Sequence, residues 1–450
     1  MKLKNSLLLA SVAILAPLLA HAQDAGESGD ASSALSALNV EMVFIFNSLL
    51  FLLGGVLVFW MAAGFAMLEA GFVRSKNVTM QLTKNIGLFA IAAFLYYLIG
   101  FNLMYPGDGW LIEGWVGAFS PTELEAVGIT ADEAADVSYA SVGSDFFFQL
   151  MFCATTASIV SGALAERIKL NGFFVFVVVL TALIYPVQAS WTWGGGFLSE
   201  AGFSDFAGST IVHSVGGWAA LVGALILGPR IGKYSKDGKV NPIPGSNLAL
   251  ATLGTFILWM GWFGFNGASQ LAMGTVGDVA DVSRIFANTN AAAAAGALAA
   301  LILTQVMFKK ADLTLMLNGA LGGLVAITAE PLAPGLGLAS LIGAIGGVIV
   351  VVTVPLLDKL KIDDVVGAIP VHLFAGIWGT IAVVLSNDDA TLGAQLYGII
   401  ATAIFVVAAS AIVWLVVKAV MGLRVDAESE VTGLDKTELG MEAYPDFTRG

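Results

Sequence analysis

Apolar runs of about the length that crosses a lipid bilayer recur along the whole chain, and they constrain its fold more than any other feature. Most have about the 20 residues that an α-helix needs to cross the hydrocarbon core. The chain is 58% hydrophobic and only 12% charged, which excludes a water-soluble globular protein. We therefore expect an all-α polytopic membrane protein with eleven transmembrane helices, at 43–72, 86–106, 145–165, 172–190, 206–228, 247–268, 285–307, 313–329, 335–356, 365–386 and 393–418.

The N-terminus has the pattern of a secretory signal. Lys2 and Lys4 precede a short apolar core, and Ala20-His21-Ala22 provides a small-residue cleavage site. We predict a signal peptide over 1–22, a membrane domain over 23–424 and a cytoplasmic C-terminal tail over 425–450; a retained signal anchor is the alternative. In either case the chain after Gln23 begins outside the cytoplasm.

The distribution of basic residues tests this topology independently, because cytoplasmic loops carry an excess of Lys and Arg. If residue 23 is outside, only Arg284 of the mature chain faces outward. Seventeen basic residues then lie on the cytoplasmic side, which predicts an outside N-terminus and a cytoplasmic C-terminus. They are Arg74, Lys76, Lys84, Arg167, Lys169, Arg230, Lys233, Lys236, Lys239, Lys309, Lys310, Lys359, Lys361, Lys418, Arg424, Lys436 and Arg449.

Two polar segments have open interpretations. The external loop at about 107–144 is acidic, which suits either cation attraction at a pore mouth or an ordinary solvated loop. The tail is polar and mixed in charge, so it is either a regulatory contact or a disordered end. The net charge of −13 comes mostly from such segments and gives no reason to expect a nucleic-acid partner.

Only two histidines follow the predicted signal, His213 and His372, and each lies within an apolar span. Ionisable side chains in a membrane usually face the protein interior and mark functional sites. A glycine follows each histidine four residues later, and the two spans run in opposite directions. This pattern is typical of an inverted repeat, here two halves of five spans with the eleventh outside the symmetry.

Depth also brings the two histidines together. Each lies eight residues after an aspartate, Asp205 or Asp364, at the start of its span. Eight residues of helix cover about 12 Å, so from opposite faces both imidazoles reach the middle of the membrane. We expect them to be neutral and hydrogen-bonded to one another. The alternative is an interhelical bond for each histidine with a purely structural role.

Several longer segments resemble the ammonium transporter/methylammonium permease/Rhesus family, in its bacterial ammonium transporter branch. The segments that carry this resemblance lie at 61–72, 161–167, 205–213, 262–266 and 318–321. The resemblance implies a homotrimer of eleven-helix protomers, each with its own pore for ammonium or ammonia, and methylammonium as an analogue. We expect no enzymatic activity, no cofactor and no metal site, since two histidines without carboxylate or thiolate neighbours make a poor metal set.

The resemblance also assigns roles to single residues. It implies an external ammonium recruitment site, a hydrophobic gate below it, a pore-lining tryptophan and the twin histidines. Core packing is the alternative for any single phenylalanine, and an N-cap role for Asp205. The assignments are recruitment by Phe148, Phe152, Trp193 and Ser269, gating by Phe152 and Phe265, pore lining by Trp262, structural and electrostatic support by Asp205, and the pore pair His213 and His372.

One departure from the family pattern lies before His372. Some relatives carry an acidic residue at the position of Gly367, and Pro370 is expected to bend the helix there. The implied function is ammonium transport across the inner cell membrane, in which ammonium is deprotonated and crosses as ammonia with net charge movement. The alternatives are a Rhesus-like channel for ammonia or carbon dioxide, and an ammonium sensor. The resemblance further implies a cytoplasmic PII-type regulatory partner.

Overall fold

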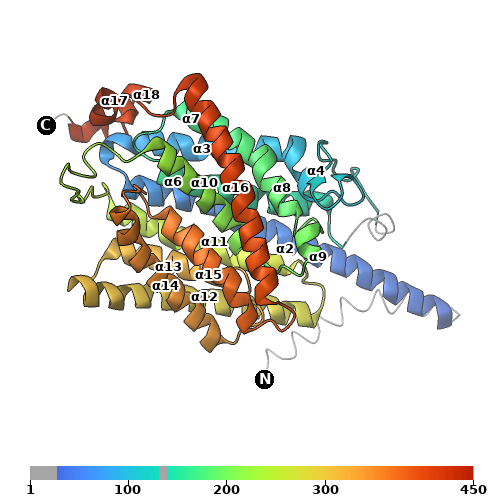
Figure 1. The fold of residues 1–450 in the computed structure, drawn as a ribbon. Helices are drawn as coiled ribbons and strands as arrows, with labels where there is room; N and C mark the ends of the chain where they lie inside the picture. The colour runs from blue at the N-terminus through green and yellow to red at the C-terminus, as the bar shows by residue number, and fades with distance from the viewer. Residues whose placement is uncertain (1–27, 131–138, 449–450) are drawn as a thin grey trace.

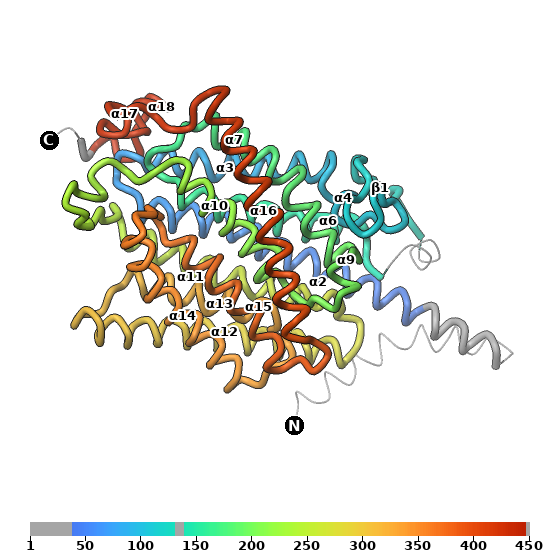
Figure 2. The backbone as a smooth tube through the Cα atoms, in the orientation of Figure 1, coloured from blue at the N-terminus to red at the C-terminus, as the bar shows by residue number. Residues whose placement is uncertain are grey.

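The structure, a computed structural model, describes residues 28–130 and 139–448, so the predicted signal peptide lies outside the described residues. The described chain forms one bundle of helices with a mostly common direction (Figures 1 and 2). Within it, nine helical segments are long and apolar enough to cross a membrane: Leu38–Phe72, Ser75–Met104, Val142–Ala163, Leu170–Ser190, Ser209–Leu227, Leu248–Gln270, Val276–Phe308, Leu336–Lys359 and Leu392–Met421. Two shorter apolar helices, Leu313–Ile327 and Ile369–Leu385, match the two remaining predicted spans.

Several of these segments change helix type along their length. The long regular helices are α2 (Ser28–Phe72), α3 (Val78–Leu95), α6 (Val142–Ala163), α7 (Leu170–Val179), α10 (Val215–Leu227), α11 (Leu248–Gly267), α12 (Val276–Phe308), α13 (Leu313–Ile327), α14 (Leu336–Lys359) and α16 (Leu392–Met421). Short helices extend them: η1 (Ser75–Asn77), η2 (Tyr96–Gly100), α4 (Phe101–Met104), η3 (Leu180–Ile184), α8 (Tyr185–Ser190), η4 (Ser209–Ser214), η5 (Ala268–Gln270), η6 (Ile369–Phe374), α15 (Ala375–Ala382) and η7 (Val383–Leu385).

The two ends of the bundle differ in what covers them. One end, which we call the hairpin end, carries the antiparallel strands β1 (Trp110–Ile112) and β2 (Val116–Gly117) and the helix α9 (Phe197–Glu200). The opposite end, which we call the tail end, carries α17 (Ala427–Thr432), α18 (Leu434–Leu439) and η8 (Pro445–Thr448). Figure 1 shows α17 and α18 at the left and α9 at the right of the same bundle.

Small residues let the helices approach closely. A Cβ on Gly254 of α11 would collide with the backbone of Leu68 in α2, and one on Gly343 of α14 would collide with Ala292 of α12. Helices in a lipid environment gain packing energy in this way, since no hydrophobic effect drives them together. The outer faces are instead apolar and exposed, as at Ile86, Phe256 and Ile404, which suits contact with lipid.

One detail of the sequence-based interpretation was wrong. The second span was expected to begin at residue 86, but α3 begins at Val78, so Lys84 is fully buried within the helix and not in a loop. Gln81 and the carbonyl of Ser161 accept its hydrogen bonds, which makes burial of the charge tolerable. The bend expected at Pro370 stays a prediction; the residue lies in the first turn of η6, where no helical N–H is needed.

Candidate functional site

The helices that carry the two histidines run in opposite directions. A single buried side chain, Arg167, shows this: its Nε donates to the carbonyl of Gly228, directly after α10, and its Nη2 to that of Asp363, shortly before η6. The end of one histidine helix and the start of the other therefore lie side by side at the tail end. This is the arrangement predicted for these two spans.

Both histidine helices begin with the same local structure. Asp205 accepts hydrogen bonds from the backbone N–H groups of four residues, 208 to 211, at 2.8 to 3.0 Å. Asp364 likewise accepts from the N–H groups of Gly367 and Ile369 at 3.0 and 2.7 Å. Carboxylates at these positions satisfy the free donors of a helix N-terminus.

The glycine between each aspartate and its histidine is required by backbone geometry. Gly208 has φ of 107° and Gly367 has φ of 80°, a left-handed region that side-chain-bearing residues rarely adopt. Gly367 is thus the counterpart of Gly208 in the other helix, which explains why an acidic side chain is missing there. Each glycine leads into a π-helical segment, η4 or η6, that contains the histidine. Such segments are rare and frequently occur at functional sites.

The imidazoles of His213 and His372 meet inside the bundle. Their Nδ1 atoms are 3.1 Å apart, and the rings are nearly parallel with centroids separated by 5.2 Å. A contact between two ring nitrogens requires one to donate and the other to accept, so the pair shares one proton at this contact. The Nε2 atom of His213 is buried and has no hydrogen-bond partner among the described residues.

A column of aromatic rings leads from His213 toward the hairpin end. Phe265 lies 5.4 Å from the His213 ring, Phe152 lies 4.1 Å from Phe265, and Phe148 lies 4.8 Å from Phe152. Trp262 also stacks on His213, at 5.0 Å, lies 5.7 Å from Phe265 and donates its Nε1–H to Thr328. The phenylalanine side chains of this column are all fully buried.

Two further residues of the predicted recruitment site lie at the top of this column. The Trp193 ring is 5.9 Å from Phe152, and its Nε1–H donates to the carbonyl of Asp205. Ser269 donates its hydroxyl proton to the carbonyl of Phe265 at 2.8 Å, which leaves the oxygen lone pairs free to accept from a ligand. Both side chains are half-buried, whereas Phe148 is buried below the surface.

The structure thus joins the residues assigned from the sequence in one set of contacts around the histidine pair. Ser269 is joined to the column through the Phe265 carbonyl. Two residues were missed: Phe65, whose ring lies 6.3 Å from His372, and Thr328, which holds Trp262. Their types are common in apolar spans, so the sequence carries no signal that marks them as neighbours of the histidines.

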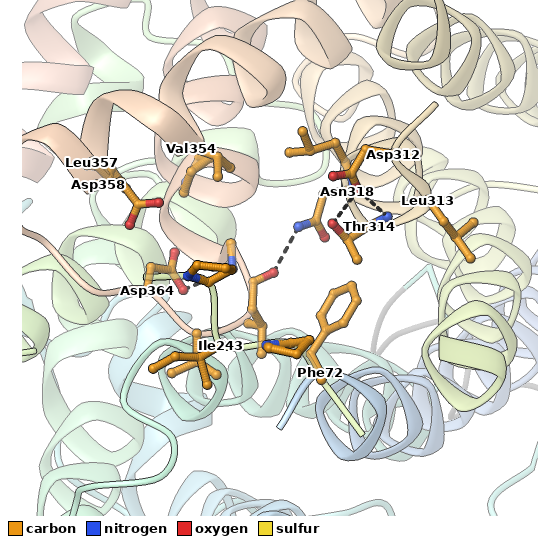
Figure 3. A pocket seen from close by; sticks show the side chains of 18 of the residues that line it. Phe72, Ile243, Asp312, Leu313, Thr314, Asn318, Val354, Leu357, Asp358 and Asp364 are labelled. Carbon is orange, nitrogen blue, oxygen red and sulfur yellow. Dashed lines mark hydrogen bonds between the residues drawn. The ribbon is translucent and has the colours of Figure 1, made fainter. Parts of the chain in front are cut away.

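At the tail end, a cleft of about 780 Å³ lies beside the segment that leads into η6 (Figure 3). Phe72, Asn318 and Pro370 are among its lining residues, and Asp312, Asp358 and Asp364 are among its polar ones. Asn318 donates to the carbonyl of Val366 and so fixes the turn before Gly367. The cleft provides room for a solute beside the helix that carries His372.

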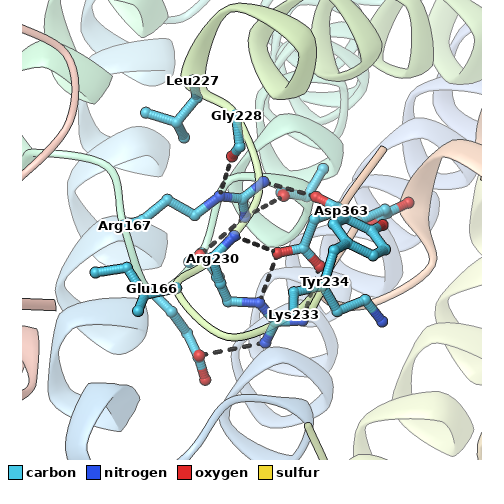
Figure 4. Close-up of polar contacts among 12 residues, drawn as sticks. Glu166, Arg167, Leu227, Gly228, Arg230, Lys233, Tyr234 and Asp363 are labelled. Atoms are coloured by element: carbon cyan, nitrogen blue, oxygen red, sulfur yellow. Dashed lines mark hydrogen bonds and ion pairs between the residues drawn. The ribbon is translucent and has the colours of Figure 1, made fainter. Parts of the chain in front are cut away.

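A network of ion pairs lies beside the segment that leads into η6 (Figure 4). Arg230 donates to Asp363 at 2.8 Å and to Glu166 at 3.2 Å, and Arg74 also pairs with Glu166, at 2.6 Å. Burial alone would raise the pKa of both carboxyls, but the arginines outweigh it and hold the pKa of Asp363 and of Glu166 below their ordinary values. Both acids are therefore ionised at neutral pH.

The tail is ordered against the loops at its end of the bundle. Asp435 accepts from the N–H groups of Thr79 and Met80 at 3.0 and 2.7 Å, and so caps α3. Leu434 is fully buried and donates its N–H to Asn77. Glu430 accepts from the N–H of Ile231, next to the ion network. Of the two expectations for the tail, these bonds support a contact and not a disordered end.

Comparison with known proteins identifies the family to which this architecture belongs. Residues 49–444 match the model of the Ammonium Transporter Family. The chain belongs to the ammonium transporter family. It is 40% identical to ammonium transporter Amt2 of Archaeoglobus fulgidus over 88% of this chain and 87% of that one. It is 34% identical to the ammonium transporter of Bacillus subtilis, over 87% and 96% of the two chains.

Solved structures agree with this membership. A protein described as a sensor Amt protein superposes with a TM-score of 0.80 at 35% identity, covering 88% of this chain and 98% of that one. Mep2 of Candida albicans superposes with a TM-score of 0.76 at 26% identity, covering 85% and 87%. The chain is therefore a multi-pass membrane protein of an ammonium transport family and not an enzyme, as the sequence resemblance implied.

Proposed function

We propose that this chain recruits ammonium at the hairpin end, removes one proton from it and conducts ammonia between the histidines to the tail end. The observation that carries the proposal is the continuous series Phe152, Phe265, His213 and His372, in which a fully buried ring pair stands directly above the histidine pair. Trp193 and Ser269 stand at the outer end of this series, where a cation would arrive.

The recruitment step follows from the chemistry of these groups. An aromatic face that is removed from water attracts a cation by up to about 2 kcal/mol. The Ser269 oxygen offers one of the hydrogen-bond acceptors that ammonium loses on leaving water. Asp205 holds its charge close by, but all four of its hydrogen bonds go to the backbone, so its first role is structural.

Selectivity follows from desolvation. An intact ion in an apolar passage costs tens of kcal/mol by a Born estimate. Ammonium avoids this cost by giving up a proton, whereas potassium cannot. The histidines supply a donor and an acceptor without a fixed charge, and we infer that the proton crosses separately, which makes transport electrogenic.

The same proposal includes the assembly around the pore. We infer eleven spans, because two shorter apolar helices add to the nine longer ones, in an inverted 5+5 repeat plus one. The protein then lies in the inner membrane of the cell. Its hairpin end faces outward, and its tail end faces the cytoplasm. We further infer that the signal is cleaved after residue 22 and that the protein forms a homotrimer. A cytoplasmic PII-type partner would bind at the tail-end cleft.

Labelled methylammonium uptake in a cell without its own ammonium transporters tests the pore assignment, together with ammonium-driven current. We expect Trp193→Leu to weaken the apparent affinity and His213→Ala to reduce the rate. Uptake unaffected by both substitutions would contradict the assignment. A current without any dependence on membrane voltage would contradict electrogenic transport.

A sensor function is the second candidate, because one similar structure is described as a sensor Amt protein. A sensor binds ammonium without passing it. Saturable ammonium binding to the purified protein, combined with no flux into proteoliposomes, would favour the sensor. Passage of carbon dioxide without an ammonium current would instead favour the Rhesus-like gas channel.

A further inference from the structure

Two charged side chains that the pore description leaves unused lie buried between α2, α3 and α6. Glu69 is 1% exposed and Lys84 is completely buried. Charged groups inside a membrane bundle are costly, and they usually mark ion or proton pathways. Neither residue lines the aromatic column, so packing of the column does not account for them.

The two charges are joined through one amide. Gln81 donates to Oε2 of Glu69 at 2.5 Å and accepts from Nζ of Lys84 at 3.0 Å. Asn85 and Ser161 add two further donors to the same carboxylate oxygen, at 2.9 and 2.8 Å. Lys84 also donates to the carbonyl of Ser161 at 2.7 Å, and its ammonium group lies 4.6 Å from the centre of the Phe173 ring.

The carboxylate is therefore held asymmetrically. All three hydrogen bonds go to Oε2, and none of the bonds among the described residues goes to Oε1. Oε1 lies 3.4 Å from the position that a Cβ on Gly162 would occupy. A carboxylate buried only for structural reasons is expected to have both oxygens satisfied.

The free oxygen lies beside a small cavity that also reaches the twin histidines. Glu69, Gly162, Val366 and His372 all line this cavity, and its other lining residues include Phe65, Leu68, Ser158 and Asn318. Its volume of about 10 Å³ is close to the space that one water molecule requires. One water there would stand between an imidazole and a carboxylate, which is the geometry of a proton relay.

We propose that Glu69 accepts the proton that ammonium releases, after His372 has passed it through this cavity. The inference rests on the proposed function and adds a residue to it. Ammonium loses one proton to the imidazole pair and continues as ammonia. His372 releases a proton to the cavity water, and the water passes one to Oε1, so the carboxylate becomes a carboxylic acid. The acid then releases the proton toward the tail end, and Lys84 favours the return to the carboxylate.

The groups that face Glu69 are consistent with this cycle. From α3 they are Gln81, Lys84 and Asn85, from α6 Ser161, and across the cavity His372. Lys84 supplies the one opposing charge among them. Because the lysine bonds Gln81 and not the carboxylate itself, Glu69 keeps one oxygen available for a transferred proton.

The test uses the full-length protein in proteoliposomes, with ammonium-driven charge movement and labelled methylammonium flux measured on the same preparation. Glu69→Gln keeps the size of the side chain and an acceptor oxygen for the three donors, but it cannot be reprotonated. Glu69→Asp keeps the carboxylate. Glu330→Gln is the matched control, because Glu330 is also a buried acid but bonds Ala333 and Asn387, away from the cavity.

We expect Glu69→Gln to reduce the ammonium-driven current by about tenfold or more, with thermal unfolding and gel-filtration elution like those of the wild type. Glu69→Asp should retain part of the current with a shifted pH profile, and Glu330→Gln should behave as the wild type.

Wild-type current in folded Glu69→Gln would overturn the inference and leave the proposed function intact. Equal loss of current in both Glu69 variants, together with a lower unfolding temperature, would also overturn it in favour of a structural role. Absence of ammonium-driven current in the wild type would instead refute the proposed proton movement itself, and the inference with it.

Discussion

His213 and His372 face one another through their Nδ1 atoms at 3.1 Å, although 159 residues separate them in the chain. Because one of these nitrogens must donate and the other accept, the two rings form a single hydrogen-bonded unit. Their contributions to transport are therefore expected not to add.

The first prediction concerns this coupling. His213→Ala and His372→Ala should each reduce labelled methylammonium uptake by about tenfold or more, and the double variant should lose little beyond the worse single one. Ser283→Ala, on the exposed face of α12, is the control. A double variant whose loss equals the product of the two single losses would show that the histidines act independently.

The second prediction concerns the close approach of the two histidine helices. A Cβ on Gly217 would lie 2.7 Å from the Cβ of Leu373, and one on Gly376 would lie 2.5 Å from the carbonyl oxygen of Ser209. Alanine at either position should destabilise the fold by about 1–3 kcal/mol through overpacking, seen as a lower unfolding temperature in detergent. Gly393→Ala has open space around it and should leave that temperature unchanged.

The third prediction concerns the ion network of Glu166, Arg230 and Asp363. Asp363→Asn leaves Arg230 without its main partner and should cost about 3–5 kcal/mol at pH 7. Since the pKa of Asp363 is lower in the folded chain, its contribution is complete at neutral pH and is lost as the pH falls through the folded-state pKa. The difference in unfolding temperature between wild type and variant should thus narrow below about pH 4.

A control for this experiment is available at Lys436, whose side chain is 57% exposed and pairs with Glu442. Lys436→Gln should change the unfolding temperature little at any pH, because ion pairs of exposed side chains contribute about 0–1 kcal/mol. A constant difference between wild type and Asp363→Asn from pH 7 to pH 3 would contradict the assignment of the stabilisation to the ionised carboxylate.

The fourth prediction concerns the tail. Asp435→Asn removes one of the two oxygens that accept from Thr79 and Met80, so the tail should detach more often. Limited proteolysis should then cleave residues after 425 faster than in the wild type. Glu428→Gln, an exposed position on α17, should digest at the wild-type rate. Equal rates for both variants would mean that the cap does not hold the tail.

Much of the fold could be predicted because span length and loop charge are properties of local sequence. The predicted limits of the third span, 145–165, differ by only a few residues from those of α6, Val142–Ala163. The pairing of His213 with His372 was also predictable, since equal distances from Asp205 and Asp364 set equal depths. Their π-helical backbone was not, because hydrophobic periodicity does not distinguish helix types over six residues.

The inner half of the site was less predictable for a different physical reason. Lys84 was placed on the cytoplasmic side, ahead of a span expected to begin at residue 86, and only its partners Gln81 and Ser161 reveal that it is buried. The role proposed for Glu69 depends on a cavity lined by residues of α2, α6, α13, η6 and the turn before η6. Contacts between segments this far apart leave no mark in local composition.

The cap that Asp435 places on α3 has a consequence for how the chain is made. Thr79 and Met80 leave the ribosome more than 350 residues before the carboxylate that satisfies their N–H groups. Until then, the start of α3 has free backbone donors, and the ordered state of that loop requires the last part of the polypeptide. A chain whose synthesis stops before Asp435 would expose the free N–H groups at the start of α3. Proteases of the cell's quality control could recognise such a chain by this unsatisfied helix end.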